Sequence, residues 1–475
     1  MPTIRRGFVV PTILSLVTVL TNLVGAGAQN VTPLCSPTIV AKRIVATPGQ
    51  RLAAGQIAQP PLTDQVDGFA WPDTPVSVIK TESGYAFFGS DGGLHSRQMW
   101  QGKWYGNNKY GSITRTLGTL DNPLGSAPPI DVTIDPNPDP TVNPFYQSYD
   151  YMGGGPVYQV PTGMPGAGNL LMVYHAEIPT IQTQSFDSVY ALAASTDQGM
   201  SWTDLGEIIR LNQGYRTDMD GFDIGDAPMV VSPDGKYFYI YFRDWLANGT
   251  THWGNTVTLV SVARAPITSV LEAAFGIKPH AVAFQKYYDG WHLDQGLGGY
   301  SEDLNPNAQY SGELQVSYSS YLQRYQMIIG EGVLVAYSES SDGLNWSLPT
   351  VLESDQNTSY VAAVGTGPDP WILGQQFYIY YTISSPRGWP GNEVGRFTVF
   401  RASEGAKGMG CGEVVPSAGA VGEESEKRVR FGIAFLLPVI SDSEIQTLRS
   451  SGPNRRVVNR FVSTTVPPGN DSARD

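Results

Sequence analysis

Four acidic residues of this sequence stand directly before runs of apolar, aromatic or β-branched residues: Asp73, Asp226, Glu313 and Asp369. Such runs are typical of β-strands. Carboxyl groups that share one site can do general acid/base chemistry, because one can be held protonated while its neighbour stays ionised. Hydrolysis of a glycosidic bond uses such a pair. These residues are therefore the first candidates for catalysis, provided that the fold brings them together.

The runs after these residues belong to a hairpin pattern that occurs five times. A strand pattern is broken by a turn and resumes as a second strand in residues 73–89, 155–175, 225–242, 313–329 and 369–382. The chain is rich in turn formers and aromatic residues, with 53 Gly, 35 Pro and 11% Phe, Trp and Tyr. We predict an all-β fold, a five-bladed β-propeller whose blades have mostly four antiparallel strands.

In a propeller the innermost strands surround the central axis, so the residues at their starts converge on one cavity. This geometry predicts that the four acidic residues share a site. The ends of the second strands add outer neighbours, which are Asp91, His175 and Glu177, and His95 follows soon after Asp91. An alternative stays open, because Asp226-Ala-Pro and Asp369-Pro can equally initiate turns.

Aromatic residues near these positions could stack on the face of a sugar ring, and packing between blades is the alternative. Trp104 and Trp291 are flanked by polar residues and Gly, which favours a ligand contact, whereas Trp371 is expected in the core. The predicted catalytic residues are Asp73, Asp91, Asp226 and Glu313. The predicted substrate-binding residues are Trp104, His95, His175, Glu177, Trp291 and Asp369.

Two further motifs indicate structure rather than chemistry. Ser195–Trp202 matches the Asp-box pattern S-x-D-x-G-x-x-W, and Ser340–Trp346 is a version one residue shorter. In both we expect the Asp to cap backbone N–H groups of a turn and the Trp to pack between sheets. Asp234, in Pro-Asp-Gly, is also predicted to be a turn residue. The segment Ile39–Val45 is the candidate for a terminal strand that closes the last blade.

The first 28 residues have the pattern of a secretory signal. Arg5-Arg6 precedes an apolar run from Phe8 to Val24, and Ala26-Gly27-Ala28 provides a small-residue cleavage site. The alternative is an uncleaved membrane anchor. Five Asn-x-Ser/Thr sequons agree with export. We predict a secreted, extracellular protein with a propeller over residues 29–403 and a poorly ordered tail over residues 404–475. Cys35 and Cys411 could form one disulfide.

The formal net charge of −13 disfavours nucleic acid and anionic membranes as partners, but not neutral glycans. Five histidines show no metal-ligand spacing, so we expect neither a catalytic metal nor a cofactor. A structural calcium ion among the axial carboxylates stays open. No Gly-x-Ser-x-Gly elbow is present. After cleavage of the signal we expect a monomer without a membrane partner.

Residues 65–402 resemble the five-bladed propeller glycosidases of the arabinanase and levansucrase superfamily. The likeness rests on the five hairpins, on the acidic strand starts and on the phrase Gly312-Glu-Leu-Gln-Val-Ser-Tyr318. Asp73, followed by Phe88-Gly-Ser-Asp91, is similar to a branch first catalogued as a domain of unknown function and later tied to endo-acting cleavage of D-arabinan.

The resemblance implies roles for individual residues. Asp73 matches the base or nucleophile, Asp226 the Asp that tunes the pKa and holds the sugar, Glu313 the acid, and Asp91 an additional acidic residue of the D-arabinan branch. The sequence departs from the family in one place. The superfamily usually carries its second Asp one blade earlier, where this chain has Gly153-Gly-Gly-Pro156.

The leading hypothesis is a secreted glycoside hydrolase that acts on a furanose-containing, arabinan-like polysaccharide or oligosaccharide by carboxylate general acid/base catalysis. The alternative is a non-catalytic glycan-binding propeller or a degenerate glycosidase. The Asp box also suggests a sialidase, but that enzyme would need an arginine triad and an Arg-Ile-Pro signature, which this sequence lacks.

Overall fold

The computed structural model describes residues 36–46, 74–90, 98–100, 103–105, 113–127, 130–149, 151–179, 186–211, 224–225, 227–244, 259–292, 297–304, 313–383 and 393–402. The chain divides into two units, 1–416 and 417–475, and all described residues belong to the first. The predicted signal sequence, both cysteines and the predicted tail lie outside the described residues.

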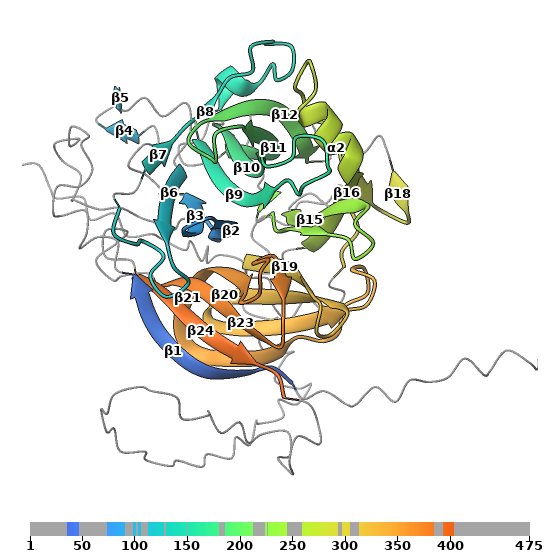
Figure 1. Ribbon diagram of the computed structural model, residues 1–475. Helices are drawn as coiled ribbons and strands as arrows, with labels where there is room; N and C mark the ends of the chain where they lie inside the picture. The colour runs from blue at the N-terminus through green and yellow to red at the C-terminus, as the bar shows by residue number, and fades with distance from the viewer. Residues whose placement is uncertain are drawn as a thin grey trace, which may run out of the picture. The chain divides into compact units, whose positions relative to one another are not determined.

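Blades 1 and 2 are antiparallel sheets of four strands each, as predicted (Figure 1). Blade 1 consists of β2 (Ser77–Thr81), β3 (Gly84–Ser90), β6 (Ile113–Gly118) and β7 (Ile130–Val132). Blade 2 consists of β9 (Tyr151–Gln159), β10 (Leu170–Pro179), β11 (Phe186–Ser195) and β12 (Trp202–Arg210), and the short β8 (Ile134–Asp135) pairs with β12 in parallel. The 3-10 helix η1 (Tyr146–Ser148) precedes β9.

Blade 3 has an inner strand in two pieces, which both pair with the second strand. These pieces are β13 (Ile224–Gly225) and β14 (Met229–Val231), and the second strand is β15 (Tyr237–Asp244). The sheet continues outward through β16 (Leu259–Pro266), β17 (Gln285–Tyr287) and β18 (Trp291–His292). The helix α2 (Ile267–Ala274) follows β16 and buries its apolar face.

Blades 4 and 5 share one long strand. Blade 4 contains β19 (Glu313–Ser319), β20 (Arg324–Ser340) and the first part of β21 (Thr350–Gly365). Blade 5 contains the second part of β21, β23 (Gln376–Ile383), β24 (Glu393–Phe400) and β1 (Thr38–Ala46). A separate hairpin joins β4 (Gln98–Trp100) to β5 (Lys103–Tyr105). The all-β, five-bladed propeller is therefore confirmed.

The predicted closing strand is also confirmed. β1 pairs with β24 from Thr38 opposite Phe400 to Ala46 opposite Val394, and Figure 1 shows the two strands side by side. Side chains of blade 5 hold the loop that follows the third strand of blade 1. Tyr380 Oη and Arg396 Nη1 both donate to the carbonyl of Leu120, each at 2.5 Å. The ring is thus closed by a strand that comes from the other end of the domain.

One predicted hairpin is wrong. Blade 5 begins with the second part of β21, where Ala362 pairs with Tyr380 and Gly365 with Phe377, rather than with a strand after Asp369. Asp369 lies in the turn between β21 and β23, and β22 (Ile372–Leu373) pairs in parallel with the end of β19. The error has a physical reason, because β21 runs on from blade 4 into blade 5 and no Gly or Pro punctuates the passage.

The blades pack through aromatic side chains. Trp202 of the Asp box is 1% exposed and meets Phe88 of blade 1 edge-on, with ring centroids 5.9 Å apart. The predicted packing role of this Trp is confirmed. Among the described helices, none combines the length and apolarity that a crossing of the bilayer requires.

Candidate active site

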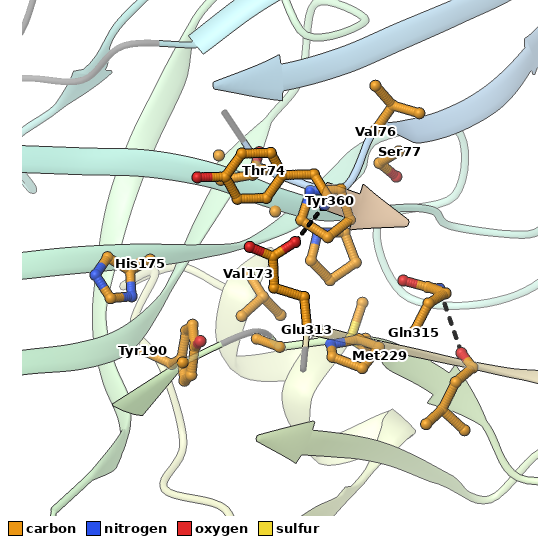
Figure 2. A pocket seen from close by; sticks show the side chains of 18 of the residues that line it. Thr74, Val76, Ser77, Val173, His175, Tyr190, Met229, Glu313, Gln315 and Tyr360 are labelled. Carbon is orange, nitrogen blue, oxygen red and sulfur yellow. Dashed lines mark hydrogen bonds between the residues drawn. The ribbon is translucent and has the colours of Figure 1, made fainter. Parts of the chain in front are cut away.

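A cavity of about 320 Å³ lies where the inner strands of all five blades meet. Each blade lines it with residues at or near its inner strand (Figure 2). They include Thr74, Val76 and Ser77 of blade 1, Tyr151 and Gly154 of blade 2, Ala227 and Met229 of blade 3, Glu313 and Gln315 of blade 4, and Tyr360 and Val364 of blade 5. This is the axial cavity that the hairpin pattern predicts.

Glu313 is the first residue of β19, and its side chain lines the cavity. Its carboxylate Oε2 accepts a hydrogen bond from the backbone N–H of Tyr360, which Figure 2 shows as a dashed line. Tyr360 has a φ of 53°, in the left-handed region that residues other than Gly rarely adopt. The register of β21 against β23 shifts between Ser359 and Ala362. This irregularity turns an N–H of blade 5 toward the carboxylate of blade 4.

The inner strand of blade 2 has three consecutive residues without a side chain, because β9 contains Gly153-Gly154-Gly155. A Cβ atom at position 153 would lie 2.7 Å from the phenol oxygen of Tyr151, so only a glycine leaves room for this ring. The Tyr151 oxygen is 2.5 Å from Ser90 Oγ of blade 1. Where the resembled superfamily carries its second Asp, this chain therefore has glycines that leave space instead of a side chain.

The space is filled from the second strand. Val173, His175 and Glu177 alternate along β10 and therefore face the same side, and all three line the cavity. His175 Nε2 lies 3.3 Å from Glu177 Oε1. The His175 ring also meets the ring of Tyr190 edge-on at 5.7 Å. Glu177 is thereby held at the cavity by a histidine whose own orientation is fixed by packing.

Arg243 of β15 lines the cavity from blade 3. It is opposite Gly225 in the sheet, and a Cβ atom at Gly225 would lie 2.8 Å from Arg243 Nη2. The guanidinium group therefore lies against the backbone of β13, where only a glycine leaves room. Among the described lining residues, Arg243 is the single Lys or Arg.

Trp371 packs against the hydrophobic core, as the sequence suggested, and it also lines the cavity. It is half-buried and packs edge-on against Tyr158 of blade 2 at 5.5 Å. Burial, together with the charge of Asp369, raises the pKa of Tyr158 to about 12, so this phenol stays neutral and able to donate a hydrogen bond.

The structure brings together three of the predicted site residues, Glu313, His175 and Glu177. Asp73, Asp91, His95, Asp226 and the side chain of Trp104 lie outside the described residues. The chain neighbours of two of these residues do line the cavity: Thr74 follows Asp73, and Gly225 and Ala227 flank Asp226.

Two predicted ligand contacts lie elsewhere. Trp291 belongs to β18, the outermost strand of blade 3, where its ring packs on the Arg264 guanidinium at 4.0 Å and on Tyr239. Asp369 accepts the backbone N–H of Trp371 at 2.9 Å, as a turn residue does. The polar surroundings of Trp291 in the sequence belong to an exposed sheet edge, and Asp369 follows an inner strand instead of preceding one.

Sequence reasoning missed Tyr151, Tyr190, Arg243 and Tyr360 as lining residues. The triple glycine was a usable signal, since glycines on an inner strand let more distant side chains reach the axis. Tyr360 contributes through its backbone N–H, and such a contribution cannot be predicted from the residue type. No cluster of three or more potential metal ligands occurs within the described part of the chain.

No family model matches the sequence, and no curated protein does. The solved structures that are similar include a family 117 glycoside hydrolase from Zobellia galactanivorans, with 12% identity, 69% of this chain and 83% of that chain covered, and a TM-score of 0.38. An α-L-arabinofuranosidase from Fusarium graminearum has 10% identity, coverage of 69% and 92%, and a TM-score of 0.34. A protein of unknown function from Dyadobacter fermentans has 13% identity, coverage of 68% and 75%, and a TM-score of 0.38.

Proposed function

We propose that this protein is a glycoside hydrolase whose axial cavity binds a carbohydrate. The observation that carries the proposal is the presence of two carboxyl groups, Glu313 and Glu177, at one cavity on different blades. Each is oriented by a specific partner, the Tyr360 N–H and the His175 ring. Hydrolysis of a glycosidic bond needs a pair of carboxyl groups, and in this proposal Glu313 is one of the pair while Glu177 holds the sugar beside it.

Glu313 acts as the general acid in this proposal. The Tyr360 N–H binds Oε2 and thereby orients the carboxyl group that gives its proton to the leaving oxygen. Because Glu313 lies on an inner strand, its carboxyl group is at the axis, within reach of a substrate bound against any of the blades. The strained backbone at Tyr360 supports a functional assignment, since such strain collects at active sites.

Asp73 serves as base or nucleophile, Asp226 tunes the pKa and holds the sugar, and Asp91 assists. These assignments come from the sequence, and the lining positions of Thr74, Gly225 and Ala227 support them. His175 and Glu177 bind substrate. We assign an arabinan-like, furanose-containing polysaccharide as the substrate and the extracellular space as the place of action, because of the family resemblance and the signal-like first 28 residues.

The test is incubation of the secreted protein with arabinans, galactans and fructans, followed by chromatography of released sugars. Glu313→Gln should lower the rate on the active substrate by at least about 100-fold, because it removes the acid proton. Glu272→Gln is the matched control, since Glu272 is exposed on α2 and should have the wild-type rate. Glycan binding without any released sugar from the wild type would instead identify a non-catalytic glycan-binding propeller.

A further inference from the structure

The cavity is not symmetric about the axis. Blades 2 and 3 line it from beyond their inner strands, whereas the described parts of the other three blades line it only with inner-strand residues and adjoining loops. The contributing residues define a lateral arm between the two blades: His175, Glu177, Phe186, Tyr190 and Arg243. Gly225 contributes to its width, because a Cβ atom at this position would lie 2.8 Å from Arg243 Nη2.

The lateral arm has a closed outer end within the described residues. Ser188 is opposite Glu177 in the pairing of β10 with β11, and its hydroxyl accepts the backbone N–H of Ile224 at 2.7 Å. Ser188 and Ile224 are both fully buried. This hydrogen bond joins blade 2 to blade 3 directly beyond Glu177. A ligand that enters the arm from the axis therefore meets a wall.

The lining of the lateral arm has the chemistry of a site for a single sugar ring. The carboxylate of Glu177 can accept hydrogen bonds from sugar hydroxyl groups, and the guanidinium group of Arg243 can donate to hydroxyl or ring oxygens. Tyr190 and Phe186 give aromatic surface for the C–H face of the ring. The total cavity volume of about 320 Å³ lies at the small end of the range for small-molecule sites, about 300–1,000 Å³. Small volume favours one or two sugar units over a long chain.

We infer that the lateral arm is a subsite for a terminal sugar of the substrate, either a chain end or a branch of one sugar. The inference rests on the proposed function and adds the place of cleavage. Within the described residues, a polysaccharide that continues in both directions has no exit past the hydrogen bond between Ser188 and Ile224. With the terminal sugar seated on Glu177 and Arg243, the bond that reaches the axis is the one that joins this sugar to the remainder.

Cleavage of that bond releases a monosaccharide. Glu313 gives its proton to the leaving oxygen as the bond from the anomeric carbon to that oxygen breaks. Water supplies the hydroxyl group of the released sugar and returns one proton to the carboxyl groups of the site, so that one water is consumed for each sugar released.

The test uses two oligosaccharides of the active polysaccharide, one linear and one with branches of one sugar, both labelled at the reducing end. The expected first product is a monosaccharide. If the labelled linear oligosaccharide is shortened one sugar at a time, the subsite binds a chain end. If only the branches are removed from the branched oligosaccharide, the subsite binds a branch sugar. A ladder of mixed internal fragments from the start would overturn the inference but leave the hydrolase assignment intact.

A second measurement addresses the lateral arm itself. Glu177→Gln should raise KM or lower the affinity for the released monosaccharide by about 10-fold or more, because a hydroxyl acceptor is lost. Saturation-transfer NMR with that monosaccharide is the readout, and Glu272→Gln is the control. Unchanged binding by a folded Glu177→Gln protein would overturn the inference. Absence of any hydrolysis by the wild type would overturn the proposed function as well.

Discussion

Acidic side chains occupy two very different settings in this propeller. At the cavity, Glu313 and Glu177 are oriented by one N–H and one histidine and face space. Three turns have the pattern Ser-x-Asp: Ser195–Asp197, Ser232–Asp234 and Ser340–Asp342. In each, the Asp carboxylate accepts the hydroxyl of the Ser in its own turn. Asp342, for example, accepts the N–H groups of Leu344 and Asn345 at 2.9 and 2.8 Å and the hydroxyl of Ser340 at 2.9 Å. No residue of these turns lines the cavity.

The difference shows that strand direction decides what an acidic residue does. Glu313 precedes an inner strand and therefore lies at the end of the blades that opens on the cavity. Asp197 follows β11, and Asp369 follows β21, so both belong to turns that reverse the chain. An acidic residue beside an apolar run is informative only when the direction of that run is known.

The strongest way to break this comparison is to neutralise acidic residues of both kinds. Asp73→Asn and Asp226→Asn should each lower the turnover of the active polysaccharide by about 100-fold or more, because both residues serve catalysis in our proposal: Asp73 precedes an inner strand, and Asp226 falls between the two pieces of another. Asp369→Asn should change the rate by less than about twofold. Steady-state kinetics on the three purified variants is the measurement. Equal losses in all three would refute the rule about strand direction.

A pH series sharpens the comparison with a carboxyl group that belongs to neither setting. Asp204 is fully buried in blade 2, where it accepts the Tyr174 hydroxyl at 2.7 Å and the Gly206 N–H at 2.8 Å. Burial raises the pKa of Asp204 to about 6 in spite of these donors. The unfolded chain loses this proton near pH 4, whereas the folded chain keeps it until about pH 6.

Asp204 should therefore make the protein more stable below pH 4 than above pH 6. The expected loss in the free energy of unfolding across this window is about 3 kcal/mol, from roughly two pKa units at 1.36 kcal/mol each. Urea unfolding at a series of pH values measures it. Asp204→Asn should flatten the slope between pH 4 and 6, and Glu272→Gln should retain it. A slope that survives in Asp204→Asn would assign it to another group.

The smallest expected effect concerns the turns themselves. Burial alone would raise the pKa of Asp342, but the donors of Asn345, Leu344 and Ser340 hold it at about 2. Asp342→Ala should destabilise the protein by about 1–2 kcal/mol, as the loss of a capping carboxylate does. Glycan turnover should stay at the wild-type rate, since this turn does not touch the cavity. A loss of turnover in a stable variant would contradict the separation of the two settings.

Much of the fold could be predicted because most blades begin with a hairpin pattern that is visible in the local sequence. The hairpins at 73–89 and 313–329 combine a turn with two apolar runs, and they become β2–β3 and β19–β20. The closing strand at Thr38–Ala46 followed from the need to leave no sheet edge open. Blade 5 was harder, because the strand β21 crosses between blades without a break that residue types would mark.

The site could be predicted only in part. Glu313, His175 and Glu177 reach the cavity from the strand positions that the pattern gave them. Arg243 and Tyr151 have room beside glycines 225 and 153, and this depends on contacts that residue types alone do not give. Trp291 shows the opposite case, since an aromatic residue in polar sequence surroundings packs on Arg264 at the rim of a sheet.

The pairing of β1 with β24 has a consequence for biosynthesis. The first strand of the domain finds its partner only after residue 400 has been made, so the ring stays open until then. Individual blades can form as their hairpins emerge, but the seal between first and last strand waits for β24. Contacts across so long a separation are slow to form. A nascent chain therefore carries an unpaired strand edge until β24 has been made, and a helper protein that shields such edges would find its target there.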